Sequence, residues 1–379
     1  MPQTGFIGFD SLKNLSKLLV KHKPAKIFLV SGKSSYEKSG AEKKINGILD
    51  GFRFIRFNGF EENPKLPDIT RGIKAFKGND CDFVIAVGGG SVIDVAKSIN
   101  LLSANDGKAE DYIKNKKKIK NKGKTLIAIP TTAGTGSEAT KFAVVYIGKT
   151  KYSLEHEFCI PDYSIVDPNL TLSLPKTVTA CSGMDALCQG IESYWSVNST
   201  KESREYAKEA IKLVVNNLVG AVNKPSRKTR ESMAIAANLA GKAINISKTT
   251  ACHSVSYPIT SYFDVPHGHA VALTLAPMLV YNSNVTSKDV LDKRGFQYVK
   301  KTIKSVSRLT GAGSVKDAAL KIKSLMKKIG LSTSLSGLGI KTKKDISIII
   351  KNGFNPSRIK NNPRILTENA LRKILEEIR

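Results

Sequence analysis

The stretch "FVIAVGGGSVIDVAKSINLL", residues 83–102, joins an apolar strand to a helix through three glycines and a serine. Glycines at such a junction let the backbone approach a pyrophosphate closely, and the N–H groups and dipole of the new helix favour its negative charge. The pattern makes Gly88, Gly89, Gly90 and Ser91 candidates for binding phosphate. Because the GxGxxG fingerprint is absent, a tight turn without any ligand is an equally good interpretation at this point.

Two further segments resemble this strand and loop: "AKIFLVSG" (25–32) and "TLIAIPTTAGTGS" (125–137). Apolar strands that alternate with helical patterns predict a parallel sheet with crossover helices, and ligands bind at the carboxyl edge of such a sheet. After "VDPNLTLSLPKTV" (166–178) the strands give way to long helical patterns. We therefore expect an α/β dinucleotide-binding domain over residues 1–170 and an all-α domain over residues 171–379. An expected helix start in the second domain is a capping box formed by Ser199 and Glu202.

Composition narrows the classes of protein. A chain of 379 residues with 41% hydrophobic content is long enough for two cores, and it has no apolar run that could span a bilayer. Five cysteines without CxxC spacing suit a reducing compartment, so we expect a cytoplasmic protein without a membrane partner. The formal net charge is +28, but the lysines are scattered and no nucleic-acid-binding motif accompanies them. We expect the densest run, residues 114–124, to be solvated surface and the overall field to attract small anions.

The segment "MDALCQGIES" (184–193) places Asp185 and Gln189 four residues apart, on one face of a predicted helix. Three of the five histidines, His253, His267 and His269, lie within residues 251–271. A divalent metal needs three or four such ligands, which predicts a site formed by Asp185, Gln189, His253 and His267. Taken singly, Asp185 as a helix cap and the histidines as ordinary surface groups remain the alternative.

Together these motifs resemble the iron-dependent, or group III, alcohol dehydrogenases, whose structural cousins include the dehydroquinate synthases. The resemblance runs along nearly the whole chain, through "GGGSVIDVAKS", "PTTAGTGSEAT", "VDPNLTLSLP", "GMDALCQGIESY", "ACHSVSYPI" and "PHGHAVAL". It implies a dinucleotide domain and a helical domain with a metal held by one aspartate and three histidines. Gln189 departs from that pattern, and its weaker, neutral oxygen tilts the preference from Zn²⁺ toward Fe²⁺, Mn²⁺ or Mg²⁺. Tyr257 stands where some relatives carry a further active-site histidine.

The segments around these ligands are similar to the phosphonoacetaldehyde reductase branch of the family. That resemblance implies reduction of phosphonoacetaldehyde to 2-hydroxyethylphosphonate in phosphonate biosynthesis, in a homodimer or larger homo-oligomer. Three alternatives stay open: an alcohol dehydrogenase for another small aldehyde, such as lactaldehyde or succinic semialdehyde; a dehydroquinate synthase-like lyase; and a nucleic-acid-binding protein derived from an enzyme.

The resemblance also implies roles for further residues. The metal would bind the aldehyde oxygen, hydride would come from the nicotinamide, and His269 or a nearby water would supply the proton. Asp94 would face the nicotinamide or favour the start of its helix. Other side chains would line the nucleotide site, namely Thr131, Thr132, Ser137 and Lys151.

Two remaining expectations concern anionic groups. Several relatives that prefer NAD carry an aspartate at the position of Gly32, so Gly32, Lys33 and Ser34 favour NADPH or mixed NAD(P)H use. The guanidinium groups of Arg358 and Arg364 are candidates for the substrate phosphonate, because they match tetrahedral oxyanions with paired hydrogen bonds. Surface ion pairs are the alternative for both arginines.

Overall fold

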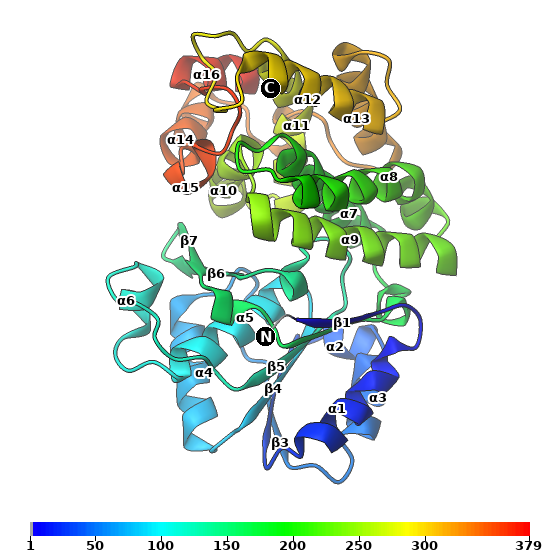
Figure 1. Ribbon diagram of the computed structural model, residues 1–379, viewed down its shortest axis with the longest axis vertical. Coiled ribbons are helices and arrows are strands. Elements are labelled where there is room, and N and C mark those ends of the chain that lie inside the picture. The colour runs from blue at the N-terminus through cyan, green and yellow to red at the C-terminus, as the bar shows by residue number, and fades with distance from the viewer. Residues whose placement is uncertain (1–2) are drawn as a thin grey trace. The chain divides into compact units, whose positions relative to one another are not determined.

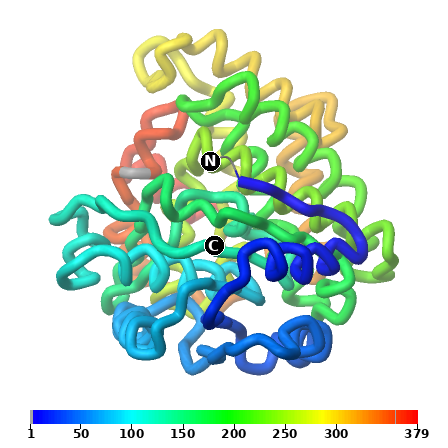
Figure 2. The backbone as a smooth tube through the Cα atoms, turned by 60° about the horizontal axis from the view of Figure 1, so that its bottom comes forward, coloured from blue at the N-terminus to red at the C-terminus, as the bar shows by residue number. Residues whose placement is uncertain are grey.

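The computed structural model describes residues 3–379 and divides the chain into two compact units, Met1–Leu174 and Pro175–Arg379. Figure 1 colours the first unit from blue to green and the second from green to red. The tube in Figure 2 follows the same order along the backbone. The boundary between the units lies in the loop before a long helix, close to the position at which the strand patterns end in the sequence.

A parallel sheet forms the centre of the first unit. Within residues 3–379 it has six strands in the order β1-β8-β5-β4-β2-β3, and every neighbouring pair is parallel. The strands are β1 (Thr4–Ile7), β2 (Ile27–Ser31), β3 (Phe54–Phe57), β4 (Phe83–Gly88), β5 (Thr125–Pro130) and β8 (Tyr163–Val166). A separate antiparallel hairpin consists of β6 (Phe142–Ile147) and β7 (Thr150–Glu155). The expected α/β architecture is confirmed.

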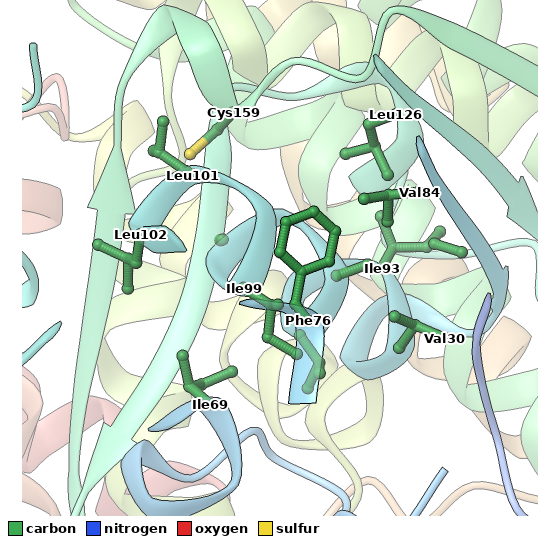
Figure 3. Packing of buried hydrophobic residues seen from close by; sticks show 14 of the residues in the cluster. Val30, Ile69, Phe76, Val84, Ile93, Ile99, Leu101, Leu102, Leu126 and Cys159 are labelled. Carbon is green, nitrogen blue, oxygen red and sulfur yellow. The ribbon is translucent and has the colours of Figure 1, made fainter. Parts of the chain in front are cut away.

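Helices cover both faces of this sheet, as the alternation of side chains along its strands requires. Val84 and Leu126 belong to the core that includes Phe76 of α4 and Ile93 of α5, shown in Figure 3. The residues next to them in the chain, Phe83, Ile85 and Ile127, point to the opposite face of the sheet. They belong to a second core, which also includes residues of α1 and α3. The helical segments of this unit are η1 (Ser11–Lys13), α1 (Asn14–His22), α2 (Ser35–Lys38), α3 (Ala41–Ile48), α4 (Leu66–Gly78), α5 (Gly90–Ser103), α6 (Ala109–Ile113), η2 (Ser137–Ala139), η3 (Glu157–Cys159) and η4 (Pro168–Thr171).

The second unit is helical throughout its described elements, and α7 lies against α8, α9, α11 and α12 (Figure 1). Most residues of α7 are buried, which is why its apolar pattern extends around the whole helix. The elements are α7 (Lys176–Trp195), α8 (Lys201–Asn223), α9 (Arg227–Ser247), α10 (Ala251–Phe263), α11 (His267–Ser283), α12 (Phe296–Leu309), α13 (Val315–Lys328), η5 (Ser336–Leu338), α14 (Lys343–Gly353), α15 (Pro356–Ile359) and α16 (Glu368–Glu377).

The expected capping box at the start of α8 was wrong by one residue. Thr200 is the N-cap and exchanges hydrogen bonds with Ser203. The hydroxyl of Ser199 instead accepts a hydrogen bond from Arg294 Nη2 at 3.2 Å. The helix therefore begins one residue later than the sequence pattern suggested. Ser199 does not cap it, because its hydroxyl is bonded to Arg294, far along the chain.

The lysine-rich run at 114–124 follows α6, and the side chains of Asn115, Lys116, Lys117 and Lys118 are exposed. This agrees with the expectation of a solvated surface. Within residues 3–379, no helix is long and apolar enough to cross a membrane.

Candidate functional site

The carboxyl edge of the parallel sheet brings together the two loops that the sequence singled out. Strands β4 and β5 are neighbours with Gly88 opposite Pro130, and Thr131 N donates to Gly88 O at 3.0 Å. The chain reverses its direction across the sheet between β2 and β4, and doubly wound sheets bind their ligands at such a point. The residues expected to bind the nucleotide phosphates therefore lie at the edge where a ligand can reach them.

At the start of α5, Gly88 and Gly90 are required by close packing rather than by unusual backbone angles, whereas a Cβ at Gly89 would make ordinary contacts with Thr132 at 3.4 Å or more. Gly88, Gly89 and Gly90 lie outside the positive-φ region. A Cβ at Gly90 would lie 2.7 Å from Cγ2 and 2.8 Å from Oγ1 of Thr135, and a Cβ at Gly88 would lie 2.5 Å from Val92 Cγ2. The second loop can therefore pack against the first turn of α5 because Gly90 lacks a side chain, and Gly88 leaves room for Val92 of the same helix.

Asp94 has a different surrounding from the one expected of a catalytic residue. Its Oδ1 accepts from Ser137 Oγ at 2.5 Å and its Oδ2 from Val144 N at 3.0 Å. Burial raises the pKa of Asp94, while the charges of Lys97 and Lys151 oppose this. With both carboxylate oxygens engaged by the loop after β5 and by β6, Asp94 holds this region of the chain together. Its expected position facing a nicotinamide stays a prediction, and the hydroxyl of Ser137 is bonded to Asp94.

Lys97, which the sequence analysis did not single out, is 1% exposed and lies beside the same loop. Its ammonium donates to Thr140 O at 2.7 Å, to Phe142 O at 2.9 Å and also to Ser137 O. A buried lysine is tolerated when oxygen acceptors surround it. Lys97 thereby ties the "TGSEAT" loop to α5.

At the end of β2, Gly32 is buried while Lys33 and Ser34 are exposed. A Cβ at Gly32 would meet Ser35 Oγ, the tip of an exposed side chain that a rotation about χ1 would move away. Arg56, on the neighbouring strand β3, donates through Nη2 to Gly32 O at 3.1 Å and through Nε to Ser31 Oγ at 2.7 Å. The strand end therefore presents basic groups and no aspartate at position 32.

In the second unit, the ligand atoms of Asp185, His253 and His267 lie within 4.8 Å of one another. Asp185 Oδ1 is 3.4 Å from His253 Nε2 and 4.0 Å from His267 Nε2. The residues come from α7, α10 and the first position of α11. One carboxylate and two imidazoles converging from three helices are a donor set that fits a divalent transition metal such as iron.

Gln189 lies one turn after Asp185 on α7, and its Nε2 donates to Asp185 Oδ2 at 3.2 Å. Because a carboxylate only accepts hydrogen bonds, the nitrogen of the amide must be the atom that faces it. A metal ion that contacts Gln189 therefore meets Oε1, a neutral oxygen in place of the imidazole usual in the family.

Gly268 explains how His267 reaches the cluster. A Cβ at position 268 would lie 1.9 Å from Cys181 O and 3.0 Å from Asp185 Cβ. The first turn of α11 therefore lies directly on the backbone of α7, and only glycine permits this approach. The segment "PHGH" thus combines a ligand with the residue that lets its helix approach Asp185.

Glu192, which the sequence analysis missed, is fully buried beside His253. Its Oε2 contacts His253 Nδ1, and its Oε1 accepts from Thr250 Oγ1 at 2.6 Å. Burial opposes a charge on His253, but the carboxylates of Glu192 and Asp185 outweigh this effect and raise the pKa of His253 to about 9. Its spacing of seven residues from Asp185, on the same helix face, is a signal that was visible in the sequence.

His269 does not join this cluster. It follows His267 by two residues, which turns its side chain to another face of α11. Its Nε2 donates to Ser332 O at 2.8 Å, and burial lowers its pKa. The structure thus gives His269 a hydrogen bond to a distant loop, and its expected role as proton donor stays a prediction.

The two candidate arginines have different surroundings. Arg358, on α15, is 7% exposed and its Nε donates to Tyr257 Oη at 3.3 Å. The Tyr257 ring lies roughly parallel to that of His267, with centroids 6.4 Å apart. Arg364 instead donates to Asp289 Oδ2 and to Tyr281 O, both at 2.7 Å. Arg358 is therefore connected to the metal-ligand cluster through Tyr257, whereas Arg364 forms an ion pair with Asp289.

The chain matches two family models, "Iron-containing alcohol dehydrogenase" over residues 2–168 and "Fe-containing alcohol dehydrogenase family, C-terminal" over residues 179–379. It is 32% identical to the phosphonoacetaldehyde reductase of Streptomyces viridochromogenes, over 83% of this chain and 81% of that protein. It is 31% identical to the NADPH-dependent butanol dehydrogenase of Clostridium saccharobutylicum, over 99% and 96%.

Among solved structures, the sulfoacetaldehyde reductase of Bifidobacterium kashiwanohense in complex with NAD⁺ superposes with a TM-score of 0.89. It shares 30% identity, and the match covers 100% of this chain and 97% of that one. The family models account for both units, and the ligand cluster fits the iron that the family contains. The chain therefore belongs to the iron-containing alcohol dehydrogenase family and is a metal-dependent oxidoreductase that uses a nicotinamide cofactor.

Proposed function

We propose that this enzyme reduces a two-carbon aldehyde that carries a tetrahedral oxyanion, and that phosphonoacetaldehyde, giving 2-hydroxyethylphosphonate, is that substrate. The observation that carries the proposal is the buried guanidinium of Arg358, linked through Tyr257 to the ring of His267. A guanidinium group presents a planar fork of N–H donors that suits two oxygens of a phosphonate.

The named relatives support the same class of substrate. The Streptomyces relative reduces phosphonoacetaldehyde, and the Bifidobacterium structure is a sulfoacetaldehyde reductase, so both names specify an aldehyde with an anionic group. The phosphonate is favoured over the sulfonate because it can carry a second negative charge, and the net charge of +28 attracts a dianion more strongly. Lactaldehyde and succinic semialdehyde lack the tetrahedral group that a guanidinium fork would recognise.

We assign the metal ligands to Asp185, His253 and His267, with Gln189 Oε1 as the fourth. When bound, the ion would act as a Lewis acid on the carbonyl oxygen, the nicotinamide would supply hydride, and a nearby water would supply the proton that completes the alcohol. Asp185 and the two imidazoles fix the position of the ion, and Gln189 keeps the Asp185 carboxylate oriented through its 3.2 Å hydrogen bond. Arg358 and Tyr257 then orient the substrate by its charged end.

The nucleotide is assigned to the carboxyl edge of the first unit, with its phosphates at the N-terminus of α5 around Gly88–Ser91, beside Thr131 and Thr132. NADPH is favoured over NADH because Lys33 and Ser34 are exposed and position 32 carries glycine in place of an aspartate that would repel a 2′-phosphate. Arg56 lies next to that turn, but its charge is paired with Glu42 Oε1 at 2.9 Å. Lys151, on β7, is assigned to the same nucleotide site from the family resemblance.

The test compares substrates and variants in one absorbance assay of NADPH and NADH oxidation with the Fe²⁺-loaded enzyme. We expect phosphonoacetaldehyde to be reduced with a higher kcat/KM than sulfoacetaldehyde, acetaldehyde, lactaldehyde or succinic semialdehyde. In Arg358→Met, loss of a charged hydrogen bond should lower kcat/KM for phosphonoacetaldehyde by about 10- to 100-fold, with little change for acetaldehyde.

Lys360→Met is the matched control, because it removes one positive charge two residues away from an exposed position. It should leave both substrates nearly unaffected. An equal loss for phosphonoacetaldehyde and acetaldehyde in Arg358→Met would show that Arg358 does not read the anionic group. A wild-type preference for acetaldehyde would refute the substrate itself.

A further inference from the structure

Glu192 lies three residues after Gln189 on α7 and meets the start of α10. Its Oε1 accepts hydrogen bonds from the backbone N–H groups of Thr250 at 3.1 Å and Cys252 at 2.9 Å. Its Oε2 contacts His253 Nδ1. One carboxylate thus satisfies N–H groups of the first turn of α10 and also holds the imidazole that this turn carries.

The chemistry of this contact determines which nitrogen of His253 carries a proton. A carboxylate only accepts hydrogen bonds, and the N-terminal end of α10 favours its negative charge. Nδ1 must therefore donate to Glu192. The lone pair that binds a metal is then on Nε2, the atom 3.4 Å from Asp185 Oδ1 and within the ligand cluster.

The carboxylate itself is held in place from its other side. Thr250 Oγ1 donates to Glu192 Oε1 at 2.6 Å and accepts from Trp195 Nε1 at 2.9 Å. Trp195 is 1% exposed and lies on the same helix as Glu192. Thr250 and Trp195 are both buried and cannot move into solvent, so the Glu192 carboxylate stays in contact with His253.

From this geometry we infer that Glu192 is a positioning residue for the metal. It fixes the tautomer and the ring orientation of His253 so that Nε2 faces Asp185 and His267. Carboxylates that accept the outer N–H of a metal-binding histidine act in this way in other metal sites. The inference rests on the metal-dependent function proposed above, but its test needs no substrate.

The test is the affinity of the full-length protein for Co²⁺, measured by competition with a chromogenic chelator. In Glu192→Gln the amide can present its NH₂ to Nδ1, which would move the proton to Nε2 and block the ligand atom. We expect the affinity to fall by about 10- to 100-fold and the visible absorption of the bound Co²⁺ to change. Ser193→Ala is the control, because it removes a buried hydroxyl next to Glu192 on α7 that accepts from Ser247 Oγ at 2.7 Å and touches neither Glu192 nor His253. It should lower the melting temperature while Co²⁺ affinity stays close to that of the wild type.

Unchanged affinity and an unchanged Co²⁺ spectrum in Glu192→Gln would overturn the inference. Should that variant not fold, the Co²⁺-loaded wild type provides a second measurement. Its proton NMR spectrum should contain a hyperfine-shifted imidazole N–H that exchanges slowly with D₂O, because Glu192 buries the Nδ1 proton of His253. Absence of that signal would contradict the inference. A wild type that binds no Co²⁺ would overturn the metal-dependent function as well, which separates the two failures.

Discussion

Gly268→Ala should damage the metal site through a single added methyl group. The new Cβ would stand 1.9 Å from Cys181 O, whereas side-chain carbons essentially never approach within 3.0 Å. The first turn of α11 and the facing turn of α7 must therefore separate by about 1 Å or more. Because His267 directly precedes this residue and Asp185 lies on the facing turn, that separation moves two ligands apart.

Three magnitudes follow from this displacement. Overpacking costs about 1–3 kcal/mol, which corresponds to roughly 5 °C in melting temperature for a unit of this size. Affinity for Co²⁺ should fall by at least about 10-fold. Since ångström-scale misplacement of a reacting geometry typically costs about 100-fold, kcat/KM should fall by about that factor.

The assays are differential scanning fluorimetry, chelator competition and NADPH oxidation, with Gly47→Ala as the matched control. Gly47 lies within a helix, α3, and a Cβ there would meet no atom within 4 Å, so this variant should be neutral or slightly stabilising. A Gly268→Ala enzyme that binds Co²⁺ as tightly as the wild type would refute the claim that close approach of α11 to α7 sets the ligand geometry.

Three further predictions concern other residues. Gln189→His should raise metal affinity, because imidazole is a stronger donor than an amide oxygen; no change in chelator competition would count against direct ligation by Gln189. Gly90→Ala should weaken NADPH binding, measured by nucleotide fluorescence titration, by about 10-fold or more without changing Co²⁺ affinity, because its Cβ would collide with Thr135; equal nucleotide affinity would exclude this loop from the site. Burial raises the pKa of Cys159 to about 12 and also raises the pKa of the partly exposed Cys181. Iodoacetamide at neutral pH should therefore label the native enzyme slowly, and at Cys181 first. Rapid labelling of Cys159, detected by mass spectrometry, would show that this thiol is accessible and not buried.

The parallel sheet and the shared helix face of Asp185 and Gln189 were predictable because their signals are local. Alternating strands and loops fix the sheet class, and the spacing of Asp185 and Gln189 puts both on one face of α7. The position of His253 and His267 relative to Asp185 depends on packing between helices. The histidine-rich segment and the family resemblance supplied that information, not the spacing alone.

Other contacts could not be predicted because their partners lie far away in the sequence. Asp289 pairs with Arg364 across 75 residues, and Ser332 accepts from His269 across 63. The sequence around Arg364 and His269 contains no signal that identifies Asp289 or Ser332 as the partner. The orientation of His269 is an exception, since a separation of two residues on a helix already turns it away from His267.

The buried ammonium of Lys97 has a consequence for the energetics of cofactor binding. Its hydrogen bonds to Ser137, Thr140 and Phe142 lie wholly within the first unit. These hydrogen bonds restrict the conformations open to the loop that follows β5. Binding then avoids most of the entropy loss that a flexible loop would suffer, so a larger share of the contact energy becomes affinity. Lys97, which lies buried within the fold, thus contributes to the affinity of the enzyme for the nucleotide.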